Sequence, residues 1–297
     1  MAAGLGTRLR PFTHHMPKPL LPLMGVPMAQ FAFDSLVGVG VTNLVANIHA
    51  HPEISRRLLG GLDLGGAKLT LSDESQGLLG SGGGIRTALP MLGNRPFYLL
   101  NADTICSVEL EGLKERHLKL RRDRGVNLTL TLFRAGPRAG KYSEIFFDEK
   151  AGLIKSLGGP VTAKPFFVGV AIIEPDALSH LPQNQAFEFV PEILKPAIAA
   201  EKAGFYLADG LWFDVGSPQL WHEAHMELIA AGERDAIPSR WRKRIEIVAE
   251  RVSANVWGDR DKNGEFELGP KSVIYGPRPD SASSTIISYD GIAVDVT

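Results

Sequence analysis

The chain has 297 residues, of which 44% are hydrophobic, and its 32 Lys and Arg residues against 33 Asp and Glu residues give a formal charge of -1. This balance excludes a global positive field that would attract nucleic acid or an anionic membrane, so any bound anion is held locally. The single cysteine, Cys106, excludes an intrachain disulfide and is expected to be a small buried hydrophobic residue. Because no run is typical of a signal peptide or a spanning helix, we expect a cytoplasmic globular protein.

Apolar strands and amphipathic helices alternate over the first half of the chain. The spacing of apolar residues predicts helices over 27–41, 52–62, 83–93 and 112–125. Strands are predicted over 43–49, 67–74, 96–104 and 126–135. This alternation is typical of an α/β fold, and we expect a mostly parallel, doubly wound (Rossmann-like) mixed sheet flanked by helices.

The organisation changes after residue 136. An antiparallel hairpin is predicted over 143–159, with its turn at "EKAG". A strand, a helix ended by Gly204, a strand–turn–strand unit and a helix capped by Ser217 complete a predicted domain over 1–232. Residues 233–297 are expected to form a linker and a small β-rich C-terminal extension, because no convincing helix follows residue 245.

The chain begins "MAAGLGTRLRPFTHHMPKPLLP", in which small residues are followed by two cations. The small residues, which would let the backbone wrap closely around a triphosphate, are Ala2, Ala3, Gly4 and Gly6. Arg8 follows directly, and Lys18 stands between two prolines that stiffen the backbone carrying its ammonium group. An ordinary glycine turn would explain the small residues alone, but the two cations favour a phosphate site. The GxGxxG pattern of a dehydrogenase is missing.

Two carboxylates follow apolar strands. Asp103 ends the strand in "LLNADT" and Asp214 ends the strand in "LWFDVGS", where α/β enzymes present their ligands. One or two carboxylates with phosphate oxygens and waters are the usual ligands of Mg²⁺. The alternative, that each aspartate only caps the next turn, stays open.

The long stretch "GLGTRLRPFTHHMPKPLLP" resembles the signature of nucleotidyltransferases that join a sugar 1-phosphate to a nucleoside triphosphate and release pyrophosphate. The resemblance continues through "ESQGLLGSGGGIRTALPMLG", "PFYLLNADTI", "FFVGVAIIEPDAL" and "GLWFDVGSPQLW", over about the first 230 residues. Within the family the chain is most similar to N-acetylmuramate-1-phosphate uridylyltransferases. Mannose-1-phosphate guanylyltransferases and glucose-1-phosphate thymidylyl- or uridylyltransferases remain alternatives.

The resemblance implies roles for particular residues. Arg8 and Lys18 would be catalytic, and Asp103 and Asp214 would hold the cofactor, Mg²⁺. The residues implied in nucleotide binding are Ala2, Ala3, Gly4, Gly6, Thr7, Glu74 and Gly77. Those implied in sugar binding are Asn101, Gly169 and Glu188, the last being the least typical of the muramate enzymes.

An alternative interpretation is that the protein has this fold but does not catalyse the reaction, and is a noncatalytic nucleotide-binding regulatory relative. The expected partners are a triphosphate, UTP first, and a sugar 1-phosphate, without nucleic acid or membrane, and a homodimer stays open. The resemblance also implies a short apolar strand before "AAG", where this chain has only Met1. We therefore expect that this strand is missing and that translation starts upstream.

Overall fold

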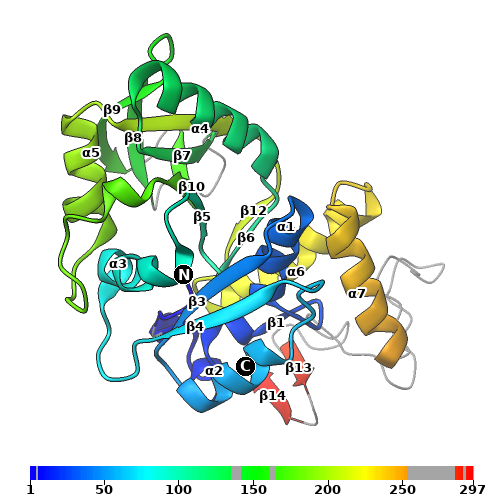
Figure 1. Ribbon diagram of the computed structural model, residues 1–297. Coiled ribbons are helices and arrows are strands. Elements are labelled where there is room, and N and C mark those ends of the chain that lie inside the picture. Colours follow the sequence, from blue (N-terminus) through cyan, green and yellow to red (C-terminus); the bar gives the residue numbers. More distant parts are fainter. Residues whose placement is uncertain (5, 135–141, 161–164, 253–284, 290–291, 297) are drawn as a thin grey trace.

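The computed structural model describes residues 1–4, 6–134, 142–160, 165–252, 285–289 and 292–296 (Figure 1). The N-terminal part has two parallel strands, β3 (Asn43–Ile48) and β4 (Lys68–Asp73). Its helices are α1 (Met28–Gly38), α2 (Pro52–Gly60) and α3 (Gly80–Leu92). A short hairpin, β1 (Pro22–Leu23) and β2 (Val26–Pro27), leads into α1. α1, α2, α3, β3 and β4 match the predicted alternation of helices and strands, whereas the hairpin was not predicted.

The largest sheet has six strands in the order β5-β10-β7-β11-β9-β8. The strands are β5 (Phe97–Leu100), β7 (Leu128–Phe133), β8 (Ser143–Asp148), β9 (Leu153–Pro160), β10 (Phe166–Ile173) and β11 (Ala203–Ala208). Only the pair β7 and β11 is parallel; the other four pairs are antiparallel. The expectation of a mostly parallel sheet is therefore wrong for this sheet. Parallel neighbours need a long crossover, whereas β8 and β9 are joined by a tight turn and β10 inserts between β5 and β7.

Two further helices agree with their predicted positions, and one differs. α4 (Leu110–Arg124) and α6 (Pro218–Glu233) form as expected, and the Ser217 Oγ accepts a hydrogen bond from the Leu220 N–H at 3.2 Å as an N-cap. The helix expected over 187–204 is a π-helical turn (Val190–Leu194) followed by the short α5 (Lys195–Ala199). It stops before Gly204 because that residue pairs with Thr129 in the sheet.

The segment after residue 238 is helical, against the sequence prediction. α7 (Ser239–Val252) contains Trp241 and Ile245, which are 1% and 0% exposed and belong to one core cluster with residues of α1 and α6. The Trp241 Nε1–H donates to the Phe31 carbonyl at 3.2 Å, and Arg244 forms an ion pair with Asp34 at 2.9 Å. The predicted linker is thus a packed helix.

The described part of the tail is a hairpin of β13 (Thr285–Tyr289) and β14 (Ile292–Val296), in line with the expected β character. Residues 253–284, 290–291 and 297 of the predicted extension lie outside the described residues. Across the ranges described, no helix is long and apolar enough to cross a membrane.

Candidate active site

A two-stranded ribbon brings the two predicted carboxylates together. β6 (Thr104–Cys106) pairs antiparallel with β12 (Trp212–Asp214), and the register sets Asp214 opposite Thr104. Asp103 precedes Thr104 and therefore lies beside Asp214, although the two are far apart in the sequence. Both carboxylates are partly exposed. The structure therefore places both aspartates at this ribbon, while their role as metal ligands stays a prediction.

Lys18 reaches this pair of carboxylates from a short 3-10 turn, Lys18–Leu20. Its Nζ donates to Asp103 Oδ2 at 2.9 Å, and the lysine side chain is only 10% exposed against 32% for the aspartate. Pro17 and Pro19 flank it and are buried, so the backbone that carries the ammonium group is fixed. The ammonium group of Lys18 is therefore held in a fixed position beside the Asp103 carboxylate.

The glycine loop packs closely against Thr13 and Lys18. Gly6 has a φ of 60°, and a Cβ at this position would lie 2.9 Å from Thr13 Cγ2 and 3.1 Å from Lys18 Cβ. The Thr13 hydroxyl donates to the Gly6 carbonyl at 2.9 Å. Only glycine combines this conformation with this close approach. At Gly4, by contrast, no described atom lies within 4 Å of a built Cβ, so the backbone there is open to a ligand.

Arg8 lies near the second carboxylate, that of Asp214. A Cβ built at Gly216 would be 3.0 Å from Arg8 Nη2 and 3.0 Å from Asp214 Oδ1, so the guanidinium and this carboxylate are neighbours. Arg8 is exposed to solvent. The N-terminal segment therefore places one buried cation, Lys18, and one exposed cation, Arg8, beside the two carboxylates.

Tyr142 is a member of the site that sequence analysis missed. Its hydroxyl donates to Asp214 Oδ2 at 2.7 Å, and its ring stacks on Phe166 and meets the edge of Trp212, with ring centroids 5.0 Å apart in each case. Burial and the hydrogen bond to Asp214 raise the pKa of the phenol, so it remains a donor near neutral pH. Trp212 packs within this ring cluster.

Replacing Tyr142 with Phe is expected to lower turnover about tenfold, because a hydrogen bond to a charged group contributes about 1.5–3 kcal/mol and here it orients Asp214. The measurement is turnover at saturating substrates together with the unfolding midpoint. Tyr98→Phe is the matched control, since the Tyr98 hydroxyl donates at 3.2 Å to the Leu110 carbonyl rather than to a carboxylate of the site. Equal turnover in the two variants would contradict a positioning role for Tyr142.

Glu74 organises the loop region from a buried position. The residue is 2% exposed, and its carboxylate accepts from Asn47 Nδ2 at 2.8 Å and from the Leu79 N–H at 3.2 Å. Asn47 in turn accepts a hydrogen bond from the Ala2 N–H at 2.7 Å. Glu74 thus connects the start of the glycine loop to the exposed Gly77 turn. Its direct contact with a nucleotide stays a prediction, and the geometry favours positioning of these two backbone segments.

Two of the three predicted sugar-binding residues meet. The Asn101 N–H donates to the Gly169 carbonyl at 3.0 Å, and a Cβ at Gly169, whose φ is 82°, would lie 2.6 Å from Asn101 Nδ2. Glu188 comes shortly before the π-helical turn in the sequence. Its carboxylate accepts hydrogen bonds from the N–H and the hydroxyl of Ser81, in the first turn of α3. The structure gives Glu188 a helix-capping contact, and its sugar contact stays a prediction.

The donor set suits Mg²⁺ better than a transition metal. Among the residues described, no group of three or more His, Cys, Asp or Glu side chains is placed to hold a metal. Two carboxylates that leave the remaining positions to phosphate oxygens and water are typical of Mg²⁺. Cys106 is buried, and burial raises its pKa to about 12, so the thiol is an inert packing group as expected.

A glycine loop, two cations and two neighbouring carboxylates are typical of an enzyme that binds phosphate groups. Residues 1–231 match the family described as "Nucleotidyl transferase", and the chain belongs to this family. It is an enzyme of the sugar-1-phosphate nucleotidyltransferase class.

The chain is also similar to individual proteins. The chain is 29% identical over 236 residues to N-acetylmuramate alpha-1-phosphate uridylyltransferase of Caulobacter vibrioides, covering 78% of this chain and 96% of that protein. It is 26% identical over 307 residues to mannose-1-phosphate guanylyltransferase of Mycobacterium tuberculosis, covering 99% and 80%. The inositol-1-phosphate CTP transferase from T. maritima has a similar fold, with a TM-score of 0.59, 17% identity and coverage of 84% of this chain and 94% of that one.

Proposed function

We propose that the chain transfers a uridylyl group from UTP to N-acetylmuramate 1-phosphate, giving the UDP-sugar and pyrophosphate for use in cell-wall sugar recycling. The similarity to the Caulobacter vibrioides uridylyltransferase, which extends over 96% of that protein, carries the choice of substrates. The meeting of Lys18, Asp103, Asp214 and Arg8 supports the reaction type, because in-line transfer between phosphates asks chiefly for positioning and charge neutralisation.

In the proposed reaction a phosphate oxygen of the sugar 1-phosphate attacks the α-phosphorus of the triphosphate. A P–O bond forms there while the bond from the α-phosphorus to the bridging oxygen breaks, and pyrophosphate carries that oxygen away. No covalent enzyme intermediate is needed. Arg8 would hold the β- and γ-phosphates and the leaving charge, and Lys18 would neutralise the α-phosphate and the sugar phosphate.

Asp103 and Asp214 would hold Mg²⁺, which when bound supplies positive charge to the phosphate oxygens. Lys18 pairs with Asp103 at 2.9 Å, so the lysine would also fix the direction in which that carboxylate points. Tyr142 does the same for Asp214 at 2.7 Å. The open backbone at Gly4 would accept the triphosphate chain through its N–H groups.

A second substrate pair has support of its own. The Mycobacterium tuberculosis guanylyltransferase matches 99% of this chain, against 78% for the Caulobacter vibrioides uridylyltransferase. GTP with mannose 1-phosphate is therefore the alternative.

Pyrophosphate release over a matrix of the four ribonucleoside triphosphates and several sugar 1-phosphates tests these assignments. We expect the highest kcat/KM for UTP with N-acetylmuramate 1-phosphate. A clear preference for GTP with mannose 1-phosphate would replace the proposed substrates. Nucleotide binding without pyrophosphate release in any combination would instead identify a noncatalytic relative.

A further inference from the structure

The chain leaves β3 through the sequence "NIHAH", which carries polar side chains at alternate positions, Asn47, His49 and His51. Asn47 lies within β3, and His51 is the residue directly before the first turn of α2. Each of the three side chains forms a hydrogen bond with the glycine loop, with the turn at 74–77, or with a residue that holds the loop. We call residues 47–51 the bridging segment.

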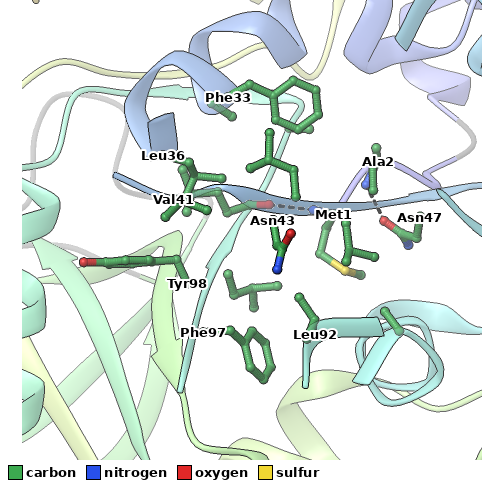
Figure 2. Close-up of a pocket in the computed structure, with 18 of the residues that line it drawn as sticks. Met1, Ala2, Phe33, Leu36, Val41, Asn43, Asn47, Leu92, Phe97 and Tyr98 are labelled. Carbon is green, nitrogen blue, oxygen red and sulfur yellow. Dashed lines mark hydrogen bonds between the residues drawn. The ribbon is translucent and has the colours of Figure 1, made fainter. Parts of the chain in front are cut away.

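Asn47 connects the loop and the turn through one side-chain amide. Its Oδ1 accepts a hydrogen bond from the Ala2 N–H at 2.7 Å, which Figure 2 shows as a dashed line beside a cavity that residues of β3 and β5 line. Its Nδ2 donates to Glu74 Oε1 at 2.8 Å. An aspartate at this position would lack the donor and would place a second charge against the Glu74 carboxylate. The two contacts together therefore require an amide.

α3 packs directly over this amide–carboxylate pair. A Cβ built at Gly84 would lie 2.6 Å from Glu74 Oε1 and 3.1 Å from Asn47 Nδ2, so only glycine fits there. Asn47 and Glu74 are 5% and 2% exposed. Water has little access to replace a hydrogen bond lost in this enclosure, so each partner depends on the other. The pair is therefore a fixed junction of β3, the 74–77 turn and α3.

His49 holds the same turn through its backbone. The His49 Nδ1 lies 2.7 Å from the Glu74 carbonyl, and because a carbonyl oxygen only accepts, this ring nitrogen carries the proton. The Gly77 N–H donates to the same carbonyl at 3.0 Å, and the Glu74 N–H donates to the Ile48 carbonyl at 2.8 Å. The turn is thus attached to the bridging segment through both the backbone and the side chain of Glu74.

His51 reaches the glycine loop through Thr13. The His51 Nε2 donates to the Thr13 carbonyl at 3.2 Å, and the Thr13 hydroxyl donates to the Gly6 carbonyl at 2.9 Å. His51 has a φ of 48°, a left-handed conformation that residues other than glycine seldom adopt. Strained residues of this kind cluster at functional sites. The strained backbone here directs the imidazole toward the residue that holds Gly6.

We propose that Asn47 and His51 are positioning residues for the nucleoside triphosphate, which act through the glycine loop rather than by touching the reacting atoms. Asn47 holds the start of the loop against the 74–77 turn, and His51 fixes the loop at Gly6 through Thr13. The two segments predicted to bind the nucleotide are held as one unit, so binding does not have to order them. The inference rests on the nucleotide-binding role that the proposed function gives these segments, and it does not depend on the base or the sugar.

The first comparison is between Asn47→Ala and Gln30→Ala. Asn47→Ala removes two hydrogen bonds and is expected to raise the KM for the triphosphate about tenfold, with kcat lowered less than about threefold. The KM for the sugar 1-phosphate should stay within about twofold. Gln30 is the matched control, because it is 3% exposed and its Nε2 also donates two hydrogen bonds, to Asp34 and to the Asp63 carbonyl, each at 2.8 Å. Gln30→Ala should lower the unfolding midpoint and leave the KM for the triphosphate unchanged.

His51→Met and His51→Gln form a second pair, which decides the question if Asn47→Ala does not fold. Both new side chains are unbranched and similar in length, but only glutamine keeps an N–H that can donate to the Thr13 carbonyl. His51→Met is expected to raise the KM for the triphosphate about fivefold, the effect of one lost hydrogen bond. His51→Gln should restore it to within about twofold of the unchanged chain. A purely structural role of His51 would not separate the two variants in this way.

Dissociation constants for the four ribonucleoside triphosphates with Mg²⁺, measured by calorimetry without sugar, give the same comparisons independently of turnover. Binding without pyrophosphate release would overturn the proposed reaction, and the Kd values would then decide the positioning role alone. That role is overturned if Asn47→Ala leaves both KM and Kd for the triphosphate within about twofold, or if Gln30→Ala raises them equally. It is also overturned if His51→Met and His51→Gln behave alike. Failure of the unchanged chain to bind any triphosphate would overturn both proposals.

Discussion

Lys18→Ala is expected to lower turnover by about two to three orders of magnitude, the usual cost of removing one fixed charge-stabilising group from a transition state. Lys18 is the buried cation of the site, and the whole residue is 8% exposed. It is fixed both by its flanking prolines and by the ion pair with Asp103. The loss should appear at saturating substrate, because the ammonium group is expected to act on charge that develops as pyrophosphate leaves. Steady-state kinetics with both substrates measures it.

The same change should affect folding far less than catalysis. Asp103 keeps 32% of its side chain exposed, so water can solvate the carboxylate once the lysine is gone, and we expect a loss of only about 1–2 kcal/mol. Lys155→Ala is the matched control. It breaks an ion pair of similar length, 2.8 Å to Glu201, between two well-exposed side chains, and should leave turnover unchanged. Near-normal turnover of Lys18→Ala at saturation would show that its assigned role is wrong.

Local signals predicted the chemical groups of this site well. Gly6 and Lys18 lie within one short stretch, and their types alone indicate a phosphate loop. Asp103 and Asp214 could be found because each lies at the end of an apolar run in the sequence. In the structure Asp214 is the last residue of β12, whereas the strand predicted over 96–104 is broken and Asp103 lies between β5 and β6. The pairing of β6 with β12, which makes them neighbours, has no local signal, so the sequence could indicate two candidate ligands without showing how they meet.

Features that depend on tertiary contacts were missed. Tyr142 has no distinctive spacing, and its role depends on Asp214 and on the rings packed around it. The direction of the main sheet was mispredicted because alternation along the chain does not specify strand order, and β10 returns between β5 and β7. α7 does follow a helical period, with Trp241, Ile245 and Val248 on one face, but its basic residues and the preceding proline favoured a linker.

Asp103→Asn and Asp214→Asn are each expected to lower turnover at least about a hundredfold and to raise the Mg²⁺ concentration needed for half-maximal rate. A neutral amide is a weaker ligand for a hard cation than a carboxylate. It can still accept a hydrogen bond from Lys18 or Tyr142, so the folded structure should persist in both variants. Pyrophosphate release at increasing Mg²⁺ measures both effects, and the unfolding midpoint checks the fold.

Asp176→Asn provides the matched control for these two variants. Asp176 also accepts a hydrogen bond from a cation, Arg121 at 2.7 Å, but it is 54% exposed and is not part of the β6–β12 ribbon. Its replacement should leave the Mg²⁺ dependence unchanged. Removal of divalent ions with EDTA should abolish the activity of the unchanged chain, and added Mg²⁺ should restore it. If both site variants kept the Mg²⁺ dependence of the unchanged chain, the cation would have to be held by the phosphates alone, and the two carboxylates would then serve only to orient Lys18 and Tyr142.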